Sequence, residues 1–145
     1  MVYMVTRTDF NRYMMPTYKP AEFVPSKARG SWVWDKKNKK YIDFASGIAV
    51  SSLGHCHPIL NKALSDQSKK IWHLSNLLTN EPALRLAKIF CKHTFAEKVF
   101  LSNSGAEAVE GAIKTARKYA YTNINKKKNE IVSFSDAFHG RTMMT

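Results

Sequence analysis

The order of patterns between residues 99 and 134 constrains the fold of this chain more than any other feature. Residues 99–101 form a short β-type run, and the small residues 102–105 form a turn after it. Apolar residues then recur at helical spacing from Ala106, and a second strand candidate covers residues 131–134. Strand, turn, helix, loop and strand in this order predict an α/β unit with parallel strands. A doubly wound domain needs further strands, so we expect the front part of a longer protein.

The first third of the chain predicts an irregular arm followed by a hairpin. Three prolines interrupt residues 1–30, which favours an extended arm over a helix. Apolar runs at 32–34 and 41–44 flank a turn centred on Asn38. Asparagine tolerates a positive φ, which suits the tight position of a hairpin turn.

Between the hairpin and residue 99 the pattern predicts a close-passing loop and two helices. Residues 46–57 hold Gly47 and Gly54 among small side chains, which is typical of a loop that passes another segment closely. Helical spacing of apolar residues predicts a helix over 58–72 and another after an Asn80 cap.

The charge of the chain raises a nucleic-acid hypothesis. The sequence has 23 Lys and Arg against 11 Asp and Glu, a formal net charge of +12. A nucleic-acid surface gathers its cations on one face, whereas these come in local groups at expected turns and helix ends. The favoured interpretation is therefore solvated loop charge without nucleic-acid binding, and a basic binding module stays as the alternative from another class.

Composition also bears on membranes, compartment and metals. No apolar run approaches the ~18 residues of a membrane span, and the first sixteen residues show no signal-peptide pattern. Two cysteines are too few for a disulfide scaffold, so we expect a reduced, cytoplasmic protein. No metal site is expected, because the spacing of the candidate ligands matches no common zinc module: His55, Cys56, His57, Cys91 and His93. Cys91 lies on an apolar helical face and is expected to be buried.

The turn before residue 106 is the first candidate for chemistry. Backbone N–H groups of Gly105 and Ala106, with the Ser104 hydroxyl, would point at one spot before the positive end of a helix. This arrangement suits a phosphate or another anion, and it equally suits an ordinary serine-capped helix.

The second candidate is Phe138-His139-Gly140-Arg141, which follows a predicted strand. Open α/β sheets place ligands in loops at the carboxyl ends of strands. The aromatic ring could stack on a flat ligand, and the guanidinium could hold a carboxylate through two hydrogen bonds. From these residues alone, a plain surface loop is an equal alternative.

Several separated motifs, in one order, resemble the class III aminotransferases, which depend on pyridoxal phosphate. The motifs are Pro20-Ala21-Glu22-Phe23-Val24-Pro25, Tyr41-Ile42-Asp43-Phe44, Gly54-His55-Cys56-His57-Pro58, Asn80-Glu81-Pro82-Ala83-Leu84-Arg85-Leu86-Ala87, Ser104-Gly105-Ala106-Glu107-Ala108 and Phe138-His139-Gly140-Arg141-Thr142. The resemblance covers nearly the whole chain. Asn38 departs from the glycine usual in the family, but asparagine can take the same conformation.

The resemblance implies an α/β fold, the fold type I of pyridoxal-phosphate transferases, active as a homodimer with sites at the subunit interface. Residues 1–57 would supply the N-terminal arm, hairpin and small-domain segment. Residues 58–145 would begin the large cofactor-binding domain with its parallel sheet, which they leave incomplete.

The resemblance also implies roles for five residues. Ser104, Gly105 and Ala106 would bind the cofactor phosphate, Phe138 would stack on the pyridine ring, and Arg141 would hold a substrate carboxylate.

No catalytic residue is expected within these residues. The family's Schiff-base lysine belongs to a motif expected beyond Thr145. Lys114 and Lys118 are no substitutes, because both lie on the outer side of a predicted helix. No role is assigned to Glu107 or His139.

Within the family, the motifs are most similar to enzymes that move the amino group of N-acetylornithine to 2-oxoglutarate, giving glutamate, in arginine biosynthesis. Relatives also act on succinyl-diaminopimelate in lysine biosynthesis. Transfer from ornithine or 4-aminobutyrate stays open, because sibling enzymes share the Phe-His-Gly-Arg motif.

Overall fold

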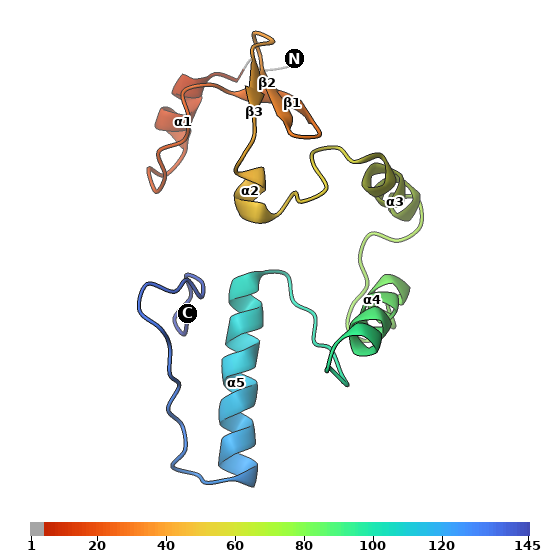
Figure 1. Cartoon of the computed structure of the whole chain (residues 1–145), viewed down its shortest axis with the longest axis vertical. Coiled ribbons are helices and arrows are strands. Elements are labelled where there is room, and N and C mark those ends of the chain that lie inside the picture. Colours follow the sequence, from red (N-terminus) through yellow and green to blue (C-terminus); the bar gives the residue numbers. More distant parts are fainter. Residues whose placement is uncertain (1–4) are drawn as a thin grey trace. The chain divides into compact units, whose positions relative to one another are not determined.

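The computed structural model describes residues 5–145, which form two compact units (Figure 1). The first unit runs to His73 and holds α1 (Arg7–Tyr13), β1 (Pro25–Arg29), β2 (Trp32–Asp35), β3 (Lys40–Ile42), α2 (Ser46–Ala49) and α3 (Pro58–Ser68). The second unit begins at Leu74 and holds α4 (Glu81–His93) and α5 (Gly105–Asn123). The expected domain division at residue 57 concerns the complete fold and stays a prediction.

The three strands of the first unit form an antiparallel sheet in the order β1-β2-β3. The register pairs Trp32 with Ile42 and Val33 with Tyr41 across the predicted hairpin. Asn38 takes a φ of 61° in the turn, the left-handed conformation expected of it. The hairpin prediction is therefore confirmed.

Asp35 organises the hairpin turn and is 8% exposed. Its Oδ1 accepts hydrogen bonds from the N–H groups of Lys37 at 2.8 Å and Lys39 at 2.9 Å, and its Oδ2 accepts one from the Tyr41 hydroxyl at 3.1 Å. Burial raises the pKa of Asp35, but these three hydrogen bonds outweigh burial and leave the pKa below its ordinary value. The Tyr41 ring stacks on Phe23 with 4.1 Å between centroids, which joins the arm to the sheet.

The expectation of an irregular arm over residues 1–30 is wrong at α1 and β1. The Asp9 carboxylate accepts hydrogen bonds from the N–H of Thr6 at 2.6 Å and from its hydroxyl at 2.8 Å, which caps α1. The prolines follow this helix instead of interrupting it. Pro25 opens β1, an edge strand, where a missing N–H is tolerated.

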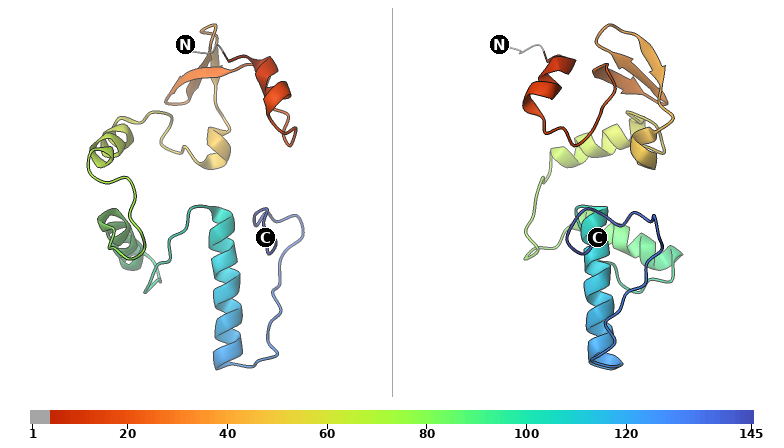
Figure 2. Two further views of the ribbon diagram at one scale, coloured as in Figure 1. Left: turned by 180° about the vertical axis from the view of Figure 1, so that it is seen from behind. Right: turned by 90° about the vertical axis from the view of Figure 1, so that its left-hand side faces the viewer.

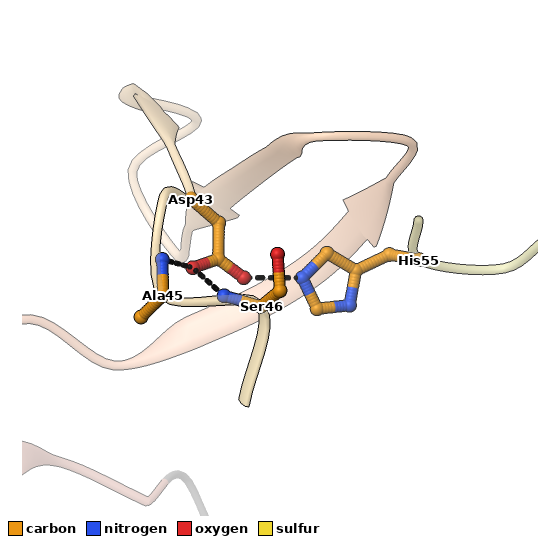
Figure 3. A network of polar contacts seen from close by, with 4 residues as sticks. All are labelled: Asp43, Ala45, Ser46 and His55. Carbon is orange, nitrogen blue, oxygen red and sulfur yellow. Dashed lines mark hydrogen bonds and ion pairs between the residues drawn. The ribbon is translucent and has the colours of Figure 1, made fainter. Parts of the chain in front are cut away.

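α2 is a left-handed turn whose four residues all have positive φ, from 48° at Ser46 to 66° at Gly47. The Asp43 carboxylate fixes the entry to this turn (Figure 3). Its Oδ1 accepts from the N–H groups of Ala45 at 3.0 Å and Ser46 at 2.9 Å, and its Oδ2 lies 2.7 Å from His55 Nε2. The hydrogen bond from His55 is the largest cause that holds the pKa of Asp43 below its ordinary value.

The loop that carries His55 passes the β1–β2 turn at close range. Gly30 and His55 exchange backbone hydrogen bonds of 2.9 and 2.8 Å. A Cβ atom on Gly54 would lie 2.9 Å from the Gly30 Cα, and Gly54 has a φ of +83°. Glycine is therefore required there, and the predicted close approach is confirmed.

The three predicted helices form with small shifts of their ends. α3 ends at Ser68 instead of residue 72, and α4 ends at His93. The Asn80 side chain caps α4 as expected, because it accepts a hydrogen bond from the Ala83 N–H at 3.1 Å.

The predicted strands at residues 99–101 and 131–134 are not formed in the described part of the chain. A strand needs a neighbour that pairs with its N–H and C=O groups, and within residues 5–145 the strand ladders join only β1, β2 and β3. The expected parallel sheet is thus absent from these residues. The chain after α5 instead runs back beside that helix towards its first turn (Figures 1 and 2).

In neither unit do the described residues form an apolar core of their own. Among the described residues no apolar side chain is buried, and Trp72 is 88% exposed and Phe95 100%. Cys91, expected to be buried, is half-buried. The apolar helical faces predicted from residue spacing are therefore formed, but no other described segment buries them.

Candidate functional site

Side chains of Ser104 and Glu107 cap the start of α5. Ser104 Oγ accepts a hydrogen bond from the Glu107 N–H at 3.3 Å. The Glu107 carboxylate accepts one from the Asn103 N–H at 2.9 Å and lies 3.2 Å from Ser104 Oγ, whose hydroxyl donates to it. Sequence reasoning gave Glu107 no role, although Ser followed three residues later by Glu is the signature of this cap.

Directly behind the cap, the helix presents backbone donors to open space. The N–H groups of Gly105 and Ala106 belong to the first turn of α5, where no intrahelical acceptor exists. A Cβ atom built on Gly105 would meet no atom within 4 Å. An anion can therefore reach this turn, and the positive end of the helix dipole favours it.

The loop after residue 137 brings the second predicted motif to the same turn. Gly140 has a φ of +143°, and a Cβ atom on it would lie 2.9 Å from the Ala106 Cβ. The backbone of Gly140 thus packs against the first turn of α5, and the two motifs, more than thirty residues apart in sequence, lie side by side.

Phe138 and Arg141 flank this contact. The Arg141 guanidinium carbon lies 5.7 Å from the centroid of the Phe138 ring, within cation–π range. Both side chains are exposed. An aromatic face and a guanidinium therefore belong to the loop that packs on the open first turn of α5. An aromatic face can stack on a flat ring, and a guanidinium can hold a carboxylate.

Glu110 holds the loop on α5, and sequence reasoning missed it. Its Oε1 accepts hydrogen bonds from Thr142 Oγ1 at 2.7 Å and from the Met144 N–H at 3.3 Å. The hydrogen bond from Thr142 is the largest cause that lowers the pKa of Glu110. Glu110 follows Ala106 by four residues, so the two share a helix face. The four-residue spacing can be read from the sequence, but the contact of Glu110 with Thr142 cannot.

The remaining residues considered from sequence are two lysines of α5 and the candidate metal ligands. Lys114 and Lys118 are exposed on α5. His55 pairs with Asp43, and the described residues contain no cluster of three or more His, Cys, Asp or Glu placed to bind a metal. In the same residues no helix is long and apolar enough to cross a membrane.

Comparison with known proteins assigns this chain to a family. Residues 13–145 match the model of aminotransferase class III, and the chain belongs to this family. Class III aminotransferases use pyridoxal phosphate.

Individual relatives are similar over nearly the whole chain. It is 58% identical over 142 residues to the acetylornithine/succinyldiaminopimelate aminotransferase of Buchnera aphidicola subsp. Schizaphis graminum, which is 98% of this chain and 35% of that protein. It is 57% identical over 141 residues to the succinylornithine transaminase/acetylornithine aminotransferase of Pseudomonas aeruginosa, and this match covers 97% of this chain and 35% of the relative. The chain thus spans about a third of the length of these relatives.

A solved structure agrees with these relatives. The ornithine aminotransferase of Toxoplasma gondii matches with a TM-score of 0.80 and 31% identity, over 96% of this chain and 34% of that one. The expected fold type I of pyridoxal-phosphate aminotransferases is confirmed by this match, while the described residues themselves form helices and a small antiparallel sheet.

Proposed function

We propose that the protein is an aminotransferase that moves the amino group of N-acetylornithine to 2-oxoglutarate with pyridoxal phosphate as cofactor, in arginine biosynthesis. Relatives at 57–58% identity with acetylornithine in their names support this substrate. Action on succinyl-diaminopimelate, named for the Buchnera relative, belongs to the same proposal. We further propose a cytoplasmic homodimer.

One observation supports the proposal: the Gly140 backbone packs on Ala106. This contact brings the Phe138–Arg141 loop to the Gly105 and Ala106 N–H groups, which we propose as the phosphate cradle. Either motif alone admits an ordinary interpretation, as a capped helix or as a surface loop. Because the two motifs are in contact, we propose that the backbone donors of the first turn, the Phe138 ring and the Arg141 guanidinium serve one ligand site.

The residues fit the cofactor in distinct roles. The N–H groups of Gly105 and Ala106 would hold the phosphate, and Ser104 would act mainly through the cap, because its hydroxyl donates to Glu107. Phe138 would cover one face of the pyridine ring. Arg141 would hold a carboxylate, which both N-acetylornithine and 2-oxoglutarate carry. When bound, pyridoxal phosphate supplies the electron sink for the transfer.

The test is a donor panel on the full-length protein with pyridoxal phosphate and 2-oxoglutarate. Glutamate formation is measured with N-acetylornithine, N-succinylornithine, ornithine and 4-aminobutyrate as donors. The highest kcat/KM is expected with N-acetylornithine. A preference for ornithine or 4-aminobutyrate would assign a sibling activity, and no transfer from any donor would refute the proposal.

A further inference from the structure

Two neighbouring contacts along one face of α5 fasten the loop at 138–145 to the helix. Ala106 meets the backbone of Gly140, and Glu110, one turn further along the same face, meets Thr142 and Met144. Arg141 lies between these two attachment points in sequence. Its backbone position relative to Gly105 and Ala106 is therefore set by both contacts.

The polar contact has a defined direction. The Glu110 carboxylate can only accept, so the Thr142 hydroxyl donates its proton to Oε1. The Thr142 oxygen then accepts from the Thr145 hydroxyl at 2.7 Å, while Thr145 Oγ1 accepts from the Thr142 N–H at 3.0 Å. The Glu110 carboxylate is thus the final acceptor of a hydrogen-bond network that Thr142 and Thr145 form within the loop.

We propose that Glu110 is a positioning residue for substrate binding: it fixes the loop that carries Arg141 at the distance from the phosphate cradle that a bound substrate requires. This inference rests on the proposed function. Glu110 itself touches neither cofactor nor substrate. It differs in its hydrogen-bond partners from Glu107, whose carboxylate accepts hydrogen bonds from Asn103 and Ser104 at the helix cap.

The experiment uses the full-length holoenzyme and three single variants. Glu110→Ala removes the acceptor, whereas Glu110→Gln keeps an oxygen that Thr142 can donate to. Glu97→Ala is the matched control, because it removes an exposed carboxylate from the same unit outside this loop. KM and kcat for the amino donor, cofactor affinity, and hydrogen–deuterium exchange over residues 138–145 are measured for each.

Glu110→Ala should raise the KM for the donor about tenfold, in line with the loss of a charge-assisted hydrogen bond. Its cofactor affinity should stay within about twofold of the parent, because the cradle is made of backbone groups of another turn. Glu110→Gln should have a KM close to the parental value, and Glu97→Ala should leave KM, kcat, cofactor affinity and exchange unchanged. An unchanged KM in Glu110→Ala, or an equal loss of cofactor and donor affinity, would overturn the proposal.

Hydrogen exchange separates this inference from the proposed function. Without any substrate present, the amides of Thr142 and Met144 should exchange about tenfold faster in Glu110→Ala than in the parent, and near the parental rate in Glu110→Gln. This result would support Glu110 as the loop anchor even if the donor panel failed. Parental exchange in Glu110→Ala would refute the anchor even if the enzyme transaminates as proposed.

A double variant checks that the contact is direct. Thr142→Val removes the donated proton at nearly constant volume. If Glu110 acts through Thr142, the exchange and KM effects of Glu110→Ala and Thr142→Val should not add when combined. Full additivity would place the effect of Glu110 elsewhere and would overturn the proposal.

Discussion

At the scale of single residues, Gly105 offers the most direct test of the phosphate cradle. A Cβ atom at this position meets nothing within 4 Å, so Gly105→Val should leave the fold intact while its methyl groups fill the space that a phosphate needs. The expected result is a clear loss of pyridoxal-phosphate affinity in the full-length protein, measured by absorbance titration, with an unchanged far-ultraviolet circular dichroism spectrum.

Gly111→Ala on the same helix is the control for Gly105→Val. Its Cβ would lie at 3.4 Å from the Phe100 ring, away from the first turn, so the cofactor affinity should stay parental. Unchanged cofactor binding in Gly105→Val would mean that this helix end is only a cap.

Arg141 tests the substrate side of the site. Loss of a charge-assisted, bidentate hydrogen bond is worth up to about 3 kcal/mol, which corresponds to roughly a hundredfold. Arg141→Ala should therefore lower kcat/KM for the carboxylate donor by about a hundredfold. Arg141→Lys should recover part of this loss, because lysine keeps the charge but not the planar fork. Cofactor absorbance should be normal in both variants; loss of cofactor with parental substrate affinity would contradict the assigned role.

At the scale of elements, the N-terminal cap of α5 allows two possible functions of Ser104, in stability and in cofactor binding, to be separated. Ser104→Ala removes the acceptor for the Glu107 N–H and should lower the free energy of unfolding by about 1 kcal/mol, measured by urea denaturation. Ser104→Asp keeps an oxygen that can accept from the Glu107 N–H, but it places a second carboxylate beside that of Glu107, so it should restore only part of the stability. Its charge should also repel the phosphate and weaken cofactor binding. If Ser104→Asp bound cofactor as well as the parent, the anion would not lie in front of this cap.

The contact between Asp43 and His55 predicts a pH dependence of stability. The folded-state pKa of Asp43 is below its ordinary value, so the stabilisation is complete above that ordinary value and is lost as the pH falls through the folded-state pKa. Asp43→Asn should therefore make the free energy of unfolding fall less steeply below about pH 4. His55→Ala should reproduce much of this change, since its hydrogen bond is the largest cause. Urea denaturation of the full-length protein across this range checks both, and parental acid slopes would contradict the assignment.

The elements also show which parts of the fold the sequence could predict. α3, α4 and α5 follow from apolar spacing and from the caps at Asn80 and Ser104, because every helix hydrogen bond joins residues four apart. α1 was missed although Thr6 and Asp9 form a recognisable capping box. The strands at 99–101 and 131–134 were predicted from their β-type residues. A strand also requires a neighbouring strand to pair with, and a local run of residues does not reveal whether one is present.

The site was predictable in its parts and less so in its assembly. The motif at 104–106 and the motif at 138–141 were identified as candidates from residue types alone. Their contact through Ala106 and Gly140, and the attachment of Thr142 to Glu110, depend on how the chain after α5 turns back. No local pattern specifies that return.

At the scale of the whole molecule, the stability of the described residues depends on further protein surface that covers their exposed apolar side chains. The described residues bury no apolar side chain, and a helix without tertiary packing is marginal in water. In the proposed homodimer, additional segments of the same fold and the partner subunit would cover these faces. Stability and cofactor binding are then properties of the assembled protein.

This dependence gives a prediction for the isolated polypeptide of residues 1–145. It should show helical far-ultraviolet circular dichroism, bind a hydrophobic dye such as anilinonaphthalene sulfonate, and melt without a cooperative transition, because no packed core resists heating. It should retain no pyridoxal-phosphate absorbance after dialysis and should transfer no amino group, because none of its lysines is assigned the bond to the cofactor. The full-length protein, the matched control, should melt cooperatively and keep its cofactor. A cooperative transition in the isolated polypeptide would show that these residues form a core of their own, and a reducible cofactor adduct at one of its lysines would show that a catalytic lysine lies within them.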